Sequence, residues 1–196
     1  MILPCNDQSI EEVVKKIQNG GVIVFPTDTV YGIGCDPRNE DAVKKIYQIK
    51  GRDKVKQLPI LAYSKEDIKE IAVLDKRSEE MADKFWPGPL TLILQIKDKK
   101  IAKALDLQDK VAVRVPGHLC MRKLLQKCRL VTGTSANFSG QPSFGDSKEL
   151  AAKFTGYDVL LDGGKIEDSC ESTIVEVIGN ELKIVRQGKI KSESLV

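Results

Sequence analysis

The chain of 196 residues is predicted to form a single α/β domain built on a mixed β-sheet with flanking helices. Helix and strand patterns alternate along the chain, which is typical of α/β folds. A hairpin signal, Ile178-Gly179-Asn180-Glu181, joins two strand-like segments near the C-terminal end and requires at least one antiparallel pair. The length and the hydrophobic share of 41% are those of one domain with a packed core.

Helices are predicted where apolar residues recur every three or four positions behind a capping residue. The segment Ser9-Ile10-Glu11-Glu12 has the pattern of a capping box, and Gly20-Gly21 ends the helix that follows it. Further helices are expected over residues 40–50, from Ser64 onward, over 76–85, near 119–127, and from Asp146 or Ser147 to Phe154.

Strands are predicted where β-branched and aliphatic residues run together between turn residues. The first is the apolar run Val22–Phe25, which Pro26 ends. The others are expected at residues 58–62, 90–96, 111–115, 130–132 and 159–161, and in a hairpin of residues 172–177 and 182–186. Residues 133–145 are expected to form a polar loop, and residues 189–196 a short polar C-terminal tail with frayed structure.

Charge, cysteine and histidine content exclude several classes of protein. The 31 basic and 28 acidic residues give a net charge of +3, which is low for a protein that coats nucleic acid. The sequence shows neither a signal peptide nor an apolar run long enough to span a membrane, so a cytoplasmic protein is expected. The five cysteines lack C-x-x-C spacing and are expected to be reduced thiols rather than disulfides or metal ligands. Because His118 is the single histidine, neither a His-rich metal site nor a Ser-His-Asp triad is expected.

Two segments carry more hydroxyl groups than packing needs. Residues 26–32 follow the first predicted strand and contain Thr27, Asp28 and Thr29, which could contact a small ligand where the strand leaves the sheet. Residues 132–143 combine glycine with serine and threonine, so the backbone could approach a ligand closely. The competing interpretations are an ordinary turn with local hydrogen bonds for the first segment and a merely flexible loop for the second.

Two other segments concentrate positive charge. The stretch from Lys44 to Lys56 holds six basic residues and one acidic residue, Asp53. It suits a polyanionic ligand, or it is a solvated cationic helix end that complements the helix dipole. Arg114 stands in a β-branched strand, where it must face water or meet an anion. It is therefore either a ligand contact or one half of a structural ion pair.

The two standard phosphate-binding patterns, G-x-x-x-x-G-K-[ST] and G-x-G-x-x-G after a strand, do not occur in the sequence. Taken together, the four segments predict a site with several cations and hydroxyl groups for an anionic ligand. Because no general base or metal cage is evident, positioning and charge stabilisation of phosphates and carboxylates are favoured over acid–base hydrolysis.

Six motifs, in the same order along the chain, resemble those of the YrdC-like family, the L-threonylcarbamoyladenylate synthases. The resemblance runs from about Gly21 to Gly188 and suggests that residues 1–188 form a YrdC-like domain. The motifs are Phe25–Gly32 (FPTDTVYG), Lys50-Gly51-Arg52 with Lys56, Trp86–Thr91 (WPGPLT), Val113–Pro116 (VRVP), Ser135–Gly140 (SANFSG) and Glu171–Ile174 (ESTI).

This resemblance implies a twisted, concave mixed sheet whose basic cleft binds ATP, L-threonine and bicarbonate. Threonine and bicarbonate would form N-carboxythreonine, whose new carboxylate attacks the α-phosphate of ATP and releases pyrophosphate. The product, L-threonylcarbamoyl-AMP, would serve a downstream transferase complex that modifies the tRNA adenosine next to the anticodon. Mg²⁺ is expected to accompany ATP, and no metal ligands from the protein are predicted.

By residue-wise resemblance, three sets of side chains are expected in the cleft. The catalytic set is Lys50, Arg52, Ser135 and Asn137. The set that binds ATP is Arg52, Lys56, Lys110, Ser135, Ser143 and Arg186. The set that contacts threonine is Thr29, Arg114, Gly133 and Ser172, with Arg114 taking the carboxylate. Lys50 and Arg52 are expected to be exposed, so that their replacement by alanine would abolish turnover and leave the fold intact.

Some positions depart from the family pattern. Asp53 and Gln57 stand where proline is usual, which implies a looser loop with less positive potential, and Gln187 replaces a frequent proline near the end of the match. Leu61 stands where some relatives have histidine, so no threonine contact is expected from that side chain. The sequence lacks the additional domain and linker of the longer members, which implies a more open site.

The main alternative is a module that binds tRNA or double-stranded RNA without catalysis. The cations of Lys44–Lys56 and Arg122–Arg129 motivate it, whereas the net charge of +3 and the aromatic share of 5% disfavour it. A contact between this basic face and tRNA would also be compatible with the enzyme. A carbamoyl-adenylate domain like that of hydrogenase-maturation carbamoyltransferases is less favoured, because acylphosphatase-like and zinc-finger segments are absent from the sequence.

Overall fold

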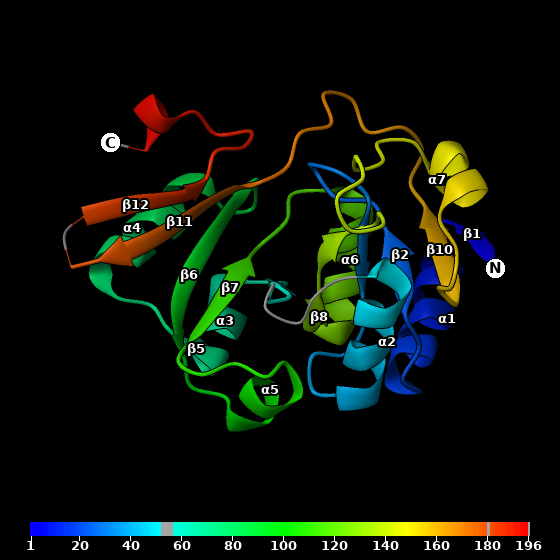
Figure 1. The fold of residues 1–196 in the computed structure, drawn as a ribbon, viewed down its shortest axis with the longest axis horizontal. Helices are drawn as coiled ribbons and strands as arrows, with labels where there is room; N and C mark the ends of the chain where they lie inside the picture. The colour runs from blue at the N-terminus through cyan, green and yellow to red at the C-terminus, as the bar shows by residue number, and fades with distance from the viewer. Residues whose placement is uncertain (52–56, 180, 196) are drawn as a thin grey trace.

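Two mixed β-sheets, rather than the one sheet expected, form the centre of the molecule (Figure 1). The computed structural model describes residues 1–51, 57–179 and 181–195. One sheet has the order β1-β10-β2-β3-β9, and the other has the order β12-β11-β6-β7-β4-β8 with β5 paired to β6. The predicted α/β class with mixed strand directions is confirmed. At Gly133 the chain passes from β8, in the larger sheet, to β9, in the five-stranded sheet.

In the five-stranded sheet four strands run in one direction, and β3 runs against them. Strands β1 (Ile2–Pro4), β10 (Val159–Asp162) and β2 (Ile23–Phe25) run parallel, and β3 (Gly32–Gly34) is antiparallel to β2 and to β9 (Thr134–Ser135). The sequence did not predict β1, β3 or β9. These strands are too short, or too rich in glycine, to show the apolar alternation of a strand, and pairing with distant strands defines them.

The larger sheet contributes most of the strands that face the site. Its central strand β6 (Leu90–Ile96) pairs parallel with β11 (Thr173–Ile178) and antiparallel with β7 (Lys110–Arg114). The predicted hairpin is confirmed, because β11 is antiparallel to β12 (Glu181–Arg186). The remaining strands are β4 (Ile60–Ala62), β5 (Ala72–Val73) and β8 (Leu130–Thr132).

Helices begin at side chains that accept the free backbone N–H groups of the first turn. Ser64 and Asp67 form a complete capping box at the start of α3. The box expected at Ser9 is wrong, because Asn6 caps α1 and accepts from the Ser9 backbone N–H at 2.9 Å. The helices are α1 (Asp7–Gln18), α2 (Glu40–Lys50), α3 (Lys65–Ile71), α4 (Lys76–Phe85), α5 (Lys99–Ala104), α6 (Leu119–Cys128) and α7 (Ser147–Lys153), with a 3₁₀ turn at Ser192–Ser194.

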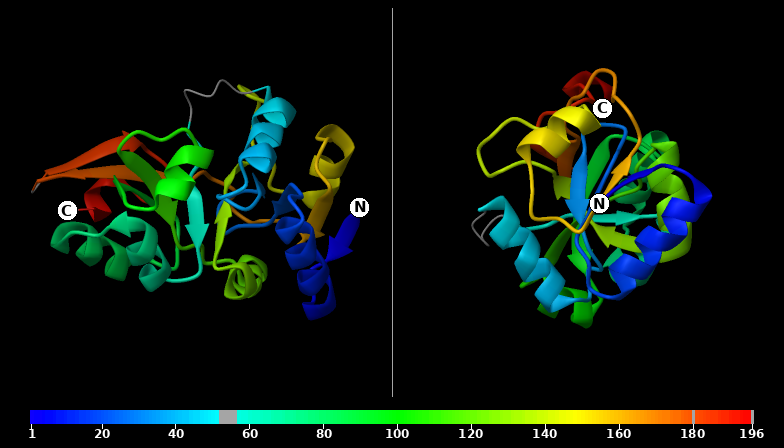
Figure 2. Two further views of the ribbon diagram at one scale, coloured as in Figure 1. Left: turned by 90° about the horizontal axis from the view of Figure 1, so that it is seen from below. Right: turned by 90° about the vertical axis from the view of Figure 1, so that its right-hand side faces the viewer.

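Two clusters of buried apolar residues hold the layers together. Helices α1 and α6 pack side by side, and their apolar faces cover β2 and β10 through residues such as Val13 and Leu124. The second cluster joins both sheets to α2–α5 and α7 through residues such as Ile33, Ile46 and Leu92. Figure 2 shows the β11–β12 hairpin and the β1–α1 region at opposite ends of the long axis. None of the helices in the described ranges is long and apolar enough to cross a lipid bilayer.

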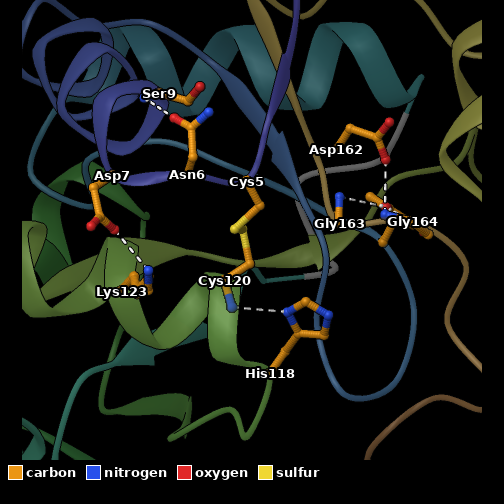
Figure 3. Close-up of a disulfide and its surroundings, with 11 residues drawn as sticks. Cys5, Asn6, Asp7, Ser9, His118, Cys120, Lys123, Asp162, Gly163 and Gly164 are labelled. Atoms are coloured by element: carbon orange, nitrogen blue, oxygen red, sulfur yellow. Dashed lines mark hydrogen bonds and ion pairs between the residues drawn. A yellow bond between two sulfur atoms is a disulfide. The ribbon is translucent and has the colours of Figure 1, made fainter.

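Cys5 and Cys120 form a disulfide, with their Cα atoms 5.9 Å apart, so the expectation that all five cysteines are reduced is wrong (Figure 3). The bond ties Cys5, which precedes the N-cap of α1, to the first turn of α6, across a sequence separation of 115 residues. Cysteine spacing could not reveal it, because α1 and α6 become neighbours only in the folded chain. Cys35, Cys128 and Cys170 are free thiols.

The segment that follows β12 is folded onto the larger sheet, so the expected fraying is wrong. Ile190 and Leu195 are buried in the main core. The Thr173 hydroxyl accepts from the backbone N–H groups of Gly188 and Ile190 at 3.0 Å each and donates to the Ile190 carbonyl at 2.8 Å. A single buried hydroxyl thus fixes the backbone of this segment against β11.

Candidate active site

A cavity of about 500 Å³ lies where the two sheets meet, within the size range of small-molecule sites. Its walls come from the loop after β2, the strands β6, β7, β11 and β12, and the loop that begins at Gly133. The polar lining includes Thr27, Thr29, Lys50, Thr91, Arg114, Ser135, Asn137, Glu171, Ser172 and Arg186, and apolar lining residues include Leu61, Ile93, Ile174 and Val185.

Arg114, the last residue of β7, is buried in the wall of this cavity. Its guanidinium donates to the Gly88 carbonyl at 2.9 Å, to Thr29 Oγ1 at 3.0 Å and to Asp28 Oδ1 at 2.6 Å. Burial lowers the pKa of Arg114, and the nearby Asp28 carboxylate opposes that shift. The structure therefore satisfies both interpretations of Arg114: it forms an ion pair, and it also lines the site.

The hydroxyl groups of the loop after β2 form a directed chain of hydrogen bonds. Because Arg114 can only donate, Thr29 Oγ1 accepts from it. Thr29 Oγ1 also lies 2.8 Å from Thr27 Oγ1, and Thr27 donates its own proton to the Val30 carbonyl at 2.7 Å. Thr29 is thus the donor of that pair. Thr27 and Thr29 therefore make the local hydrogen bonds of a turn and also line the cavity.

Lys50 is buried, so the expectation that it is exposed is wrong. It is the last residue of α2, and its side chain reaches the loop after β9 instead of solvent. Its ammonium donates to the Ser135 carbonyl, to the Asn137 carbonyl at 2.8 Å and to Asn137 Oδ1 at 3.0 Å. In return, the Lys50 carbonyl accepts from the Ser139 backbone N–H at 2.8 Å. Replacement of Lys50 by alanine would therefore also release this loop.

Ser135 and Asn137 lie together beside Lys50. Ser135 Oγ donates to Asn137 Oδ1 at 2.6 Å, and the Asn137 amide nitrogen donates to the Gln141 carbonyl. These bonds fix the orientation of the Asn137 amide. Three of the expected catalytic residues thus form one hydrogen-bonded group in the cavity wall.

The opposite side of the cavity is formed by Arg186, Glu171 and Ser172. Arg186 donates to Glu171 Oε2 at 2.6 Å, to the Ser172 carbonyl at 2.8 Å and to Ser172 Oγ at 3.0 Å. Ser172 Oγ also lies 2.9 Å from Thr91 Oγ1. Ser143 donates to the other Glu171 oxygen at 3.1 Å, which places it next to the cavity lining.

Gly133 lets the backbone approach the cavity floor. A Cβ atom at this position would come within 2.6 Å of the Leu61 side chain, so a larger residue would displace one of the two. Leu61 stands in the cavity wall as an apolar residue, as the sequence indicates. The Gly133 N–H donates to the Pro59 carbonyl at 2.8 Å, which ties the two walls together.

Not every expected site residue is placed in the cavity. Lys110 lies at the start of β7, and its ammonium pairs with Glu176 at 2.5 Å on the surface, outside the cavity lining of the described residues. Arg52 and Lys56, together with Asp53, lie outside the described residues. The assignment of Arg52, Lys56 and Lys110 to ATP, and of Arg52 to catalysis, stays a prediction.

The sets of site residues taken from the resemblance omit three residues that hold the site in place. Asp28 and Glu171 each pair with one of the two cavity arginines, and Thr91 lies against Ser172. All three stand inside motifs quoted above. Their position as polar residues within a motif could therefore have marked them as part of the site. Their partners lie far away in the sequence and could not be named from it.

Comparison with known proteins agrees with this geometry. The Sua5/YciO/YrdC family model, described as telomere recombination, matches residues 15–188. The chain belongs to the Sua5/YciO/YrdC family. The family expected from the six motifs is therefore confirmed, and the match covers every residue of the predicted cleft.

Members of the Sua5/YciO/YrdC family that resemble the chain differ in length. The threonylcarbamoyl-AMP synthase of Pyrococcus abyssi is 35% identical over 185 residues, which are 91% of this chain and 54% of that protein. The threonylcarbamoyl-AMP synthase of Aliivibrio fischeri is 30% identical over 182 residues, 90% of this chain and 98% of that protein. The chain thus spans about half the length of the first relative and nearly all of the second.

A solved structure in the family has the same fold. The crystal structure of P. abyssi Sua5 complexed with L-threonine superposes with a TM-score of 0.91 at 32% identity. The match covers 100% of this chain and 59% of that one.

Proposed function

We propose that this chain makes L-threonylcarbamoyl-AMP and pyrophosphate from L-threonine, bicarbonate and ATP. The observation that carries the proposal is the buried Arg114 guanidinium, which lines a cavity of about 500 Å³ among hydroxyl groups. Relatives named threonylcarbamoyl-AMP synthase, and a Sua5 structure with L-threonine, support the choice of substrate and reaction.

Threonine binds at the Arg114 end of the cavity. Three of the five guanidinium N–H groups have acceptors in the described part of the chain, which leaves one on each terminal nitrogen. Two such donors suit the two oxygens of a carboxylate. Thr29 and Gly133 line the cavity beside Arg114, and Ser172 marks its boundary with the phosphate end.

The phosphates of ATP bind at the Arg186 end, where Ser143 adds a hydroxyl group beside Glu171, and Ser135 adds one from the facing wall of the cavity. Arg186 is partly exposed and paired with Glu171, so its guanidinium can exchange that carboxylate for a phosphate oxygen. The loop of Ser135 and Asn137, held by Lys50, lines the same cavity. It is therefore placed to contact the carbamate and the α-phosphate together.

The reaction needs little covalent chemistry from the protein. The threonine amine adds to the carbon of bicarbonate, and loss of water leaves the carbamate of N-carboxythreonine. A carbamate oxygen then forms a bond to the α-phosphorus of ATP, and the bond to the bridging oxygen breaks with release of pyrophosphate. The protein contributes a fixed approach of two anions and cations that stabilise the developing charge.

Mg²⁺ is proposed to enter as part of the ATP substrate. The described residues contain no group of three or more His, Cys, Asp and Glu side chains that could hold a metal ion. This donor set fits an ion carried mainly by phosphate oxygens, with Glu171 as the carboxylate nearest the proposed phosphate end. When bound, the ion would neutralise phosphate charge.

The proposed product is an activated intermediate that a partner must use. A mixed anhydride of a carbamate and AMP hydrolyses readily, so a transferase complex that passes the threonylcarbamoyl group to a tRNA adenosine is proposed downstream. A cytoplasmic location is also proposed, because the product would have to reach a transferase that acts on tRNA.

The alternative of an RNA-binding module is not favoured. Within the described part of the two basic segments, four cations pair with acidic neighbours. The pairs are Lys44 with Glu40 at 2.9 Å, Lys45 with Asp158 at 2.9 Å, Lys123 with Asp7 at 2.7 Å and Arg129 with Asp67 at 2.6 Å. Direct contact with tRNA stays a prediction.

The function is tested by pyrophosphate release from ATP in the presence of Mg²⁺, with threonine and bicarbonate omitted in turn. Release should depend on both, and mass spectrometry should detect threonylcarbamoyl-AMP. Pyrophosphate release that ignores threonine would contradict the proposal, as would its complete absence. Serine and valine are the matched competitors, because each differs from threonine at the side chain alone.

A further inference from the structure

Asp28 has an unusual set of contacts behind the cavity wall. Its Oδ1 accepts from the Arg114 guanidinium at 2.6 Å and from the Gly117 backbone N–H at 2.9 Å. Its Oδ2 is buried, and within the described part of the chain it has no hydrogen-bond partner. Asp28 is not among the cavity-lining residues of that part. It touches the residue that would hold the substrate, without facing the substrate.

A purely structural ion pair would explain these contacts poorly. Burying Arg114 beside the Asp28 carboxylate, whose side chain is 21% exposed, costs free energy that their attraction returns only when the remaining polar atoms are also satisfied. The unpartnered Oδ2 adds a further cost. An apolar pair would serve stability at least as well at this position. The retained charges therefore point to a role in function.

The geometry gives Asp28 such a role through the orientation of Arg114. The three acceptors of the guanidinium come from two segments: Gly88 lies before β6, and Asp28 and Thr29 lie in the loop after β2. Among them Asp28 is the only charged group, and its contact with the guanidinium is the shortest. A guanidinium held at all three nitrogens cannot turn about its bond to the chain, so its two remaining N–H groups keep one direction.

Resting on the function proposed above, we propose that Asp28 is a positioning residue for the substrate carboxylate. It fixes the direction in which Arg114 presents its two remaining N–H groups. The guanidinium is therefore already oriented before threonine enters the cavity, and binding does not have to supply that entropy cost. Because Asp28 already offsets the Arg114 charge, recognition depends on the geometry of the fork more than on bare charge.

The test compares Asp28→Asn with the wild type in steady-state kinetics. Asn keeps the size and one acceptor oxygen but loses the charge, so Arg114 is held less firmly. We expect the KM for L-threonine to rise about tenfold or more. The kcat value and the KM for ATP should change less than about twofold, a separation that general loss of folding would not produce. Asp28→Glu keeps the charge and should recover part of the threonine affinity.

Asp158→Asn is the matched control. Asp158 also accepts from a cation, Lys45 at 2.9 Å, and from a backbone N–H, that of Val22 at 2.8 Å, but it lies away from this cavity. Its replacement should lower thermal stability and leave the KM for threonine within about twofold. If Asp28→Asn behaves like this control, or if its KM values for ATP and threonine rise together, the positioning role is overturned.

Titration calorimetry with L-threonine separates this inference from the proposed reaction. Weaker threonine binding by Asp28→Asn supports the positioning role even if the wild type releases no pyrophosphate, a result that would sink only the reaction. Unchanged binding by both Asp28 variants, with an active wild type, would sink only the positioning role.

Discussion

Two arginines in one cavity are held in contrasting ways. The Arg114 side chain is 6% exposed and bound by acceptors from two loops, whereas the Arg186 side chain is 39% exposed and pairs with Glu171, itself 38% exposed. Burial lowers the pKa of Arg114, and the charge of Arg186 across the site lowers it further. The Arg114 end of the cavity is held in one geometry before a ligand binds, and we call it the fixed end. The Arg186 end can rearrange, and we call it the adjustable end.

This difference matches the two kinds of anion that the proposed reaction brings together. A carboxylate on a small amino acid is rigid and gains from a fork that needs no reorganisation. A triphosphate chain is flexible and highly charged, so an exposed cation that moves with it is sufficient. Specificity should therefore be concentrated at the Arg114 end.

The largest expected effect comes from Arg114→Lys, which breaks the fixed end. Lysine keeps a charge but cannot offer two parallel N–H groups, and it leaves buried acceptors without a donor. We expect kcat/KM for threonine to fall about 10²–10³-fold, measured by pyrophosphate release.

Arg38→Lys is the control for this change. Arg38 pairs with Asp98 at 2.9 Å on the surface, with a side chain that is 42% exposed. It should change the same quantity less than about twofold. A loss at Arg114 of less than tenfold would mean that the fork is not what recognises threonine.

Reduction of the Cys5–Cys120 bond tests how much this disulfide stabilises the part of the fold next to Arg114. Cys120 lies six residues after Arg114, and the bond closes a loop across 115 residues. We expect reduction to lower the free energy of unfolding by about 2–4 kcal/mol, measured by urea denaturation with and without a thiol reductant.

Cys5→Ser is the reference for that measurement, because its stability should not respond to the reductant. Cys170→Ser, at an exposed free thiol, should respond as the wild type does. Equal stability of the oxidised and reduced wild type would show that packing of α1 against α6 holds this region without the bond.

Arg186→Ala tests the adjustable end. Loss of charge-assisted contacts to phosphate should raise the KM for ATP about tenfold, with the KM for threonine within about twofold. Titration of each substrate at saturating levels of the other measures both values. A parallel rise in both would mean that the two ends do not act separately.

Acid should lower the stability of the chain through His118. Burial lowers the pKa of His118 below its ordinary value of 6.5, since desolvation outweighs the attraction of Asp28. The folded state thus binds this proton less readily than the unfolded chain, and the resulting stability is present above pH 6.5 and lost as pH falls below it. We expect a small decrease in Tm from this group between pH 7 and pH 5.

His118→Asn isolates that contribution. His118 Nδ1 accepts from the Cys120 backbone N–H at 3.2 Å, and asparagine can cap a helix in the same way. The variant should lose Tm less steeply over this pH range than the wild type. Identical slopes would assign the acid sensitivity to other groups.

The smallest effect is expected for Lys110→Ala. Sequence resemblance assigns Lys110 to ATP, whereas the structure pairs it with Glu176 on the surface, where the Lys110 side chain is 59% exposed. The geometry predicts a change of less than about twofold in the KM for ATP. A larger rise would show that Lys110 reaches the nucleotide when it binds.

Local signals in the sequence predicted most of the helices and the longer strands. Residues 40–50 and the hairpin around Gly179 are determined by neighbours within a few positions, and the structure has them where expected. The N-cap of α1 was misplaced because Ser9 and Asn6 are both good caps, and only the helix start in the fold decides between them.

Distant contacts set the limits of the site prediction. The motifs identified most of the cavity residues, yet the burial of Lys50 depends on carbonyls at Ser135 and Asn137, 85 to 87 positions away. The pairing of Cys5 with Cys120 has the same origin. Such contacts depend on how the two sheets meet, and the sequence pattern of one segment does not determine that arrangement.

The segment after β12 also reaches the fixed end of the cavity, since Lys189 donates to the Asp28 carbonyl at 3.2 Å. The Arg114 end thus depends on pieces separated by 161 positions, joined by contacts of very high sequence separation. Contacts of this kind form late in folding, because the loops that they close are long. The ability to hold threonine should consequently appear only in the last step of folding and vanish in the first step of unfolding. Threonine in the medium would then slow proteolysis of the whole chain, rather than of one loop.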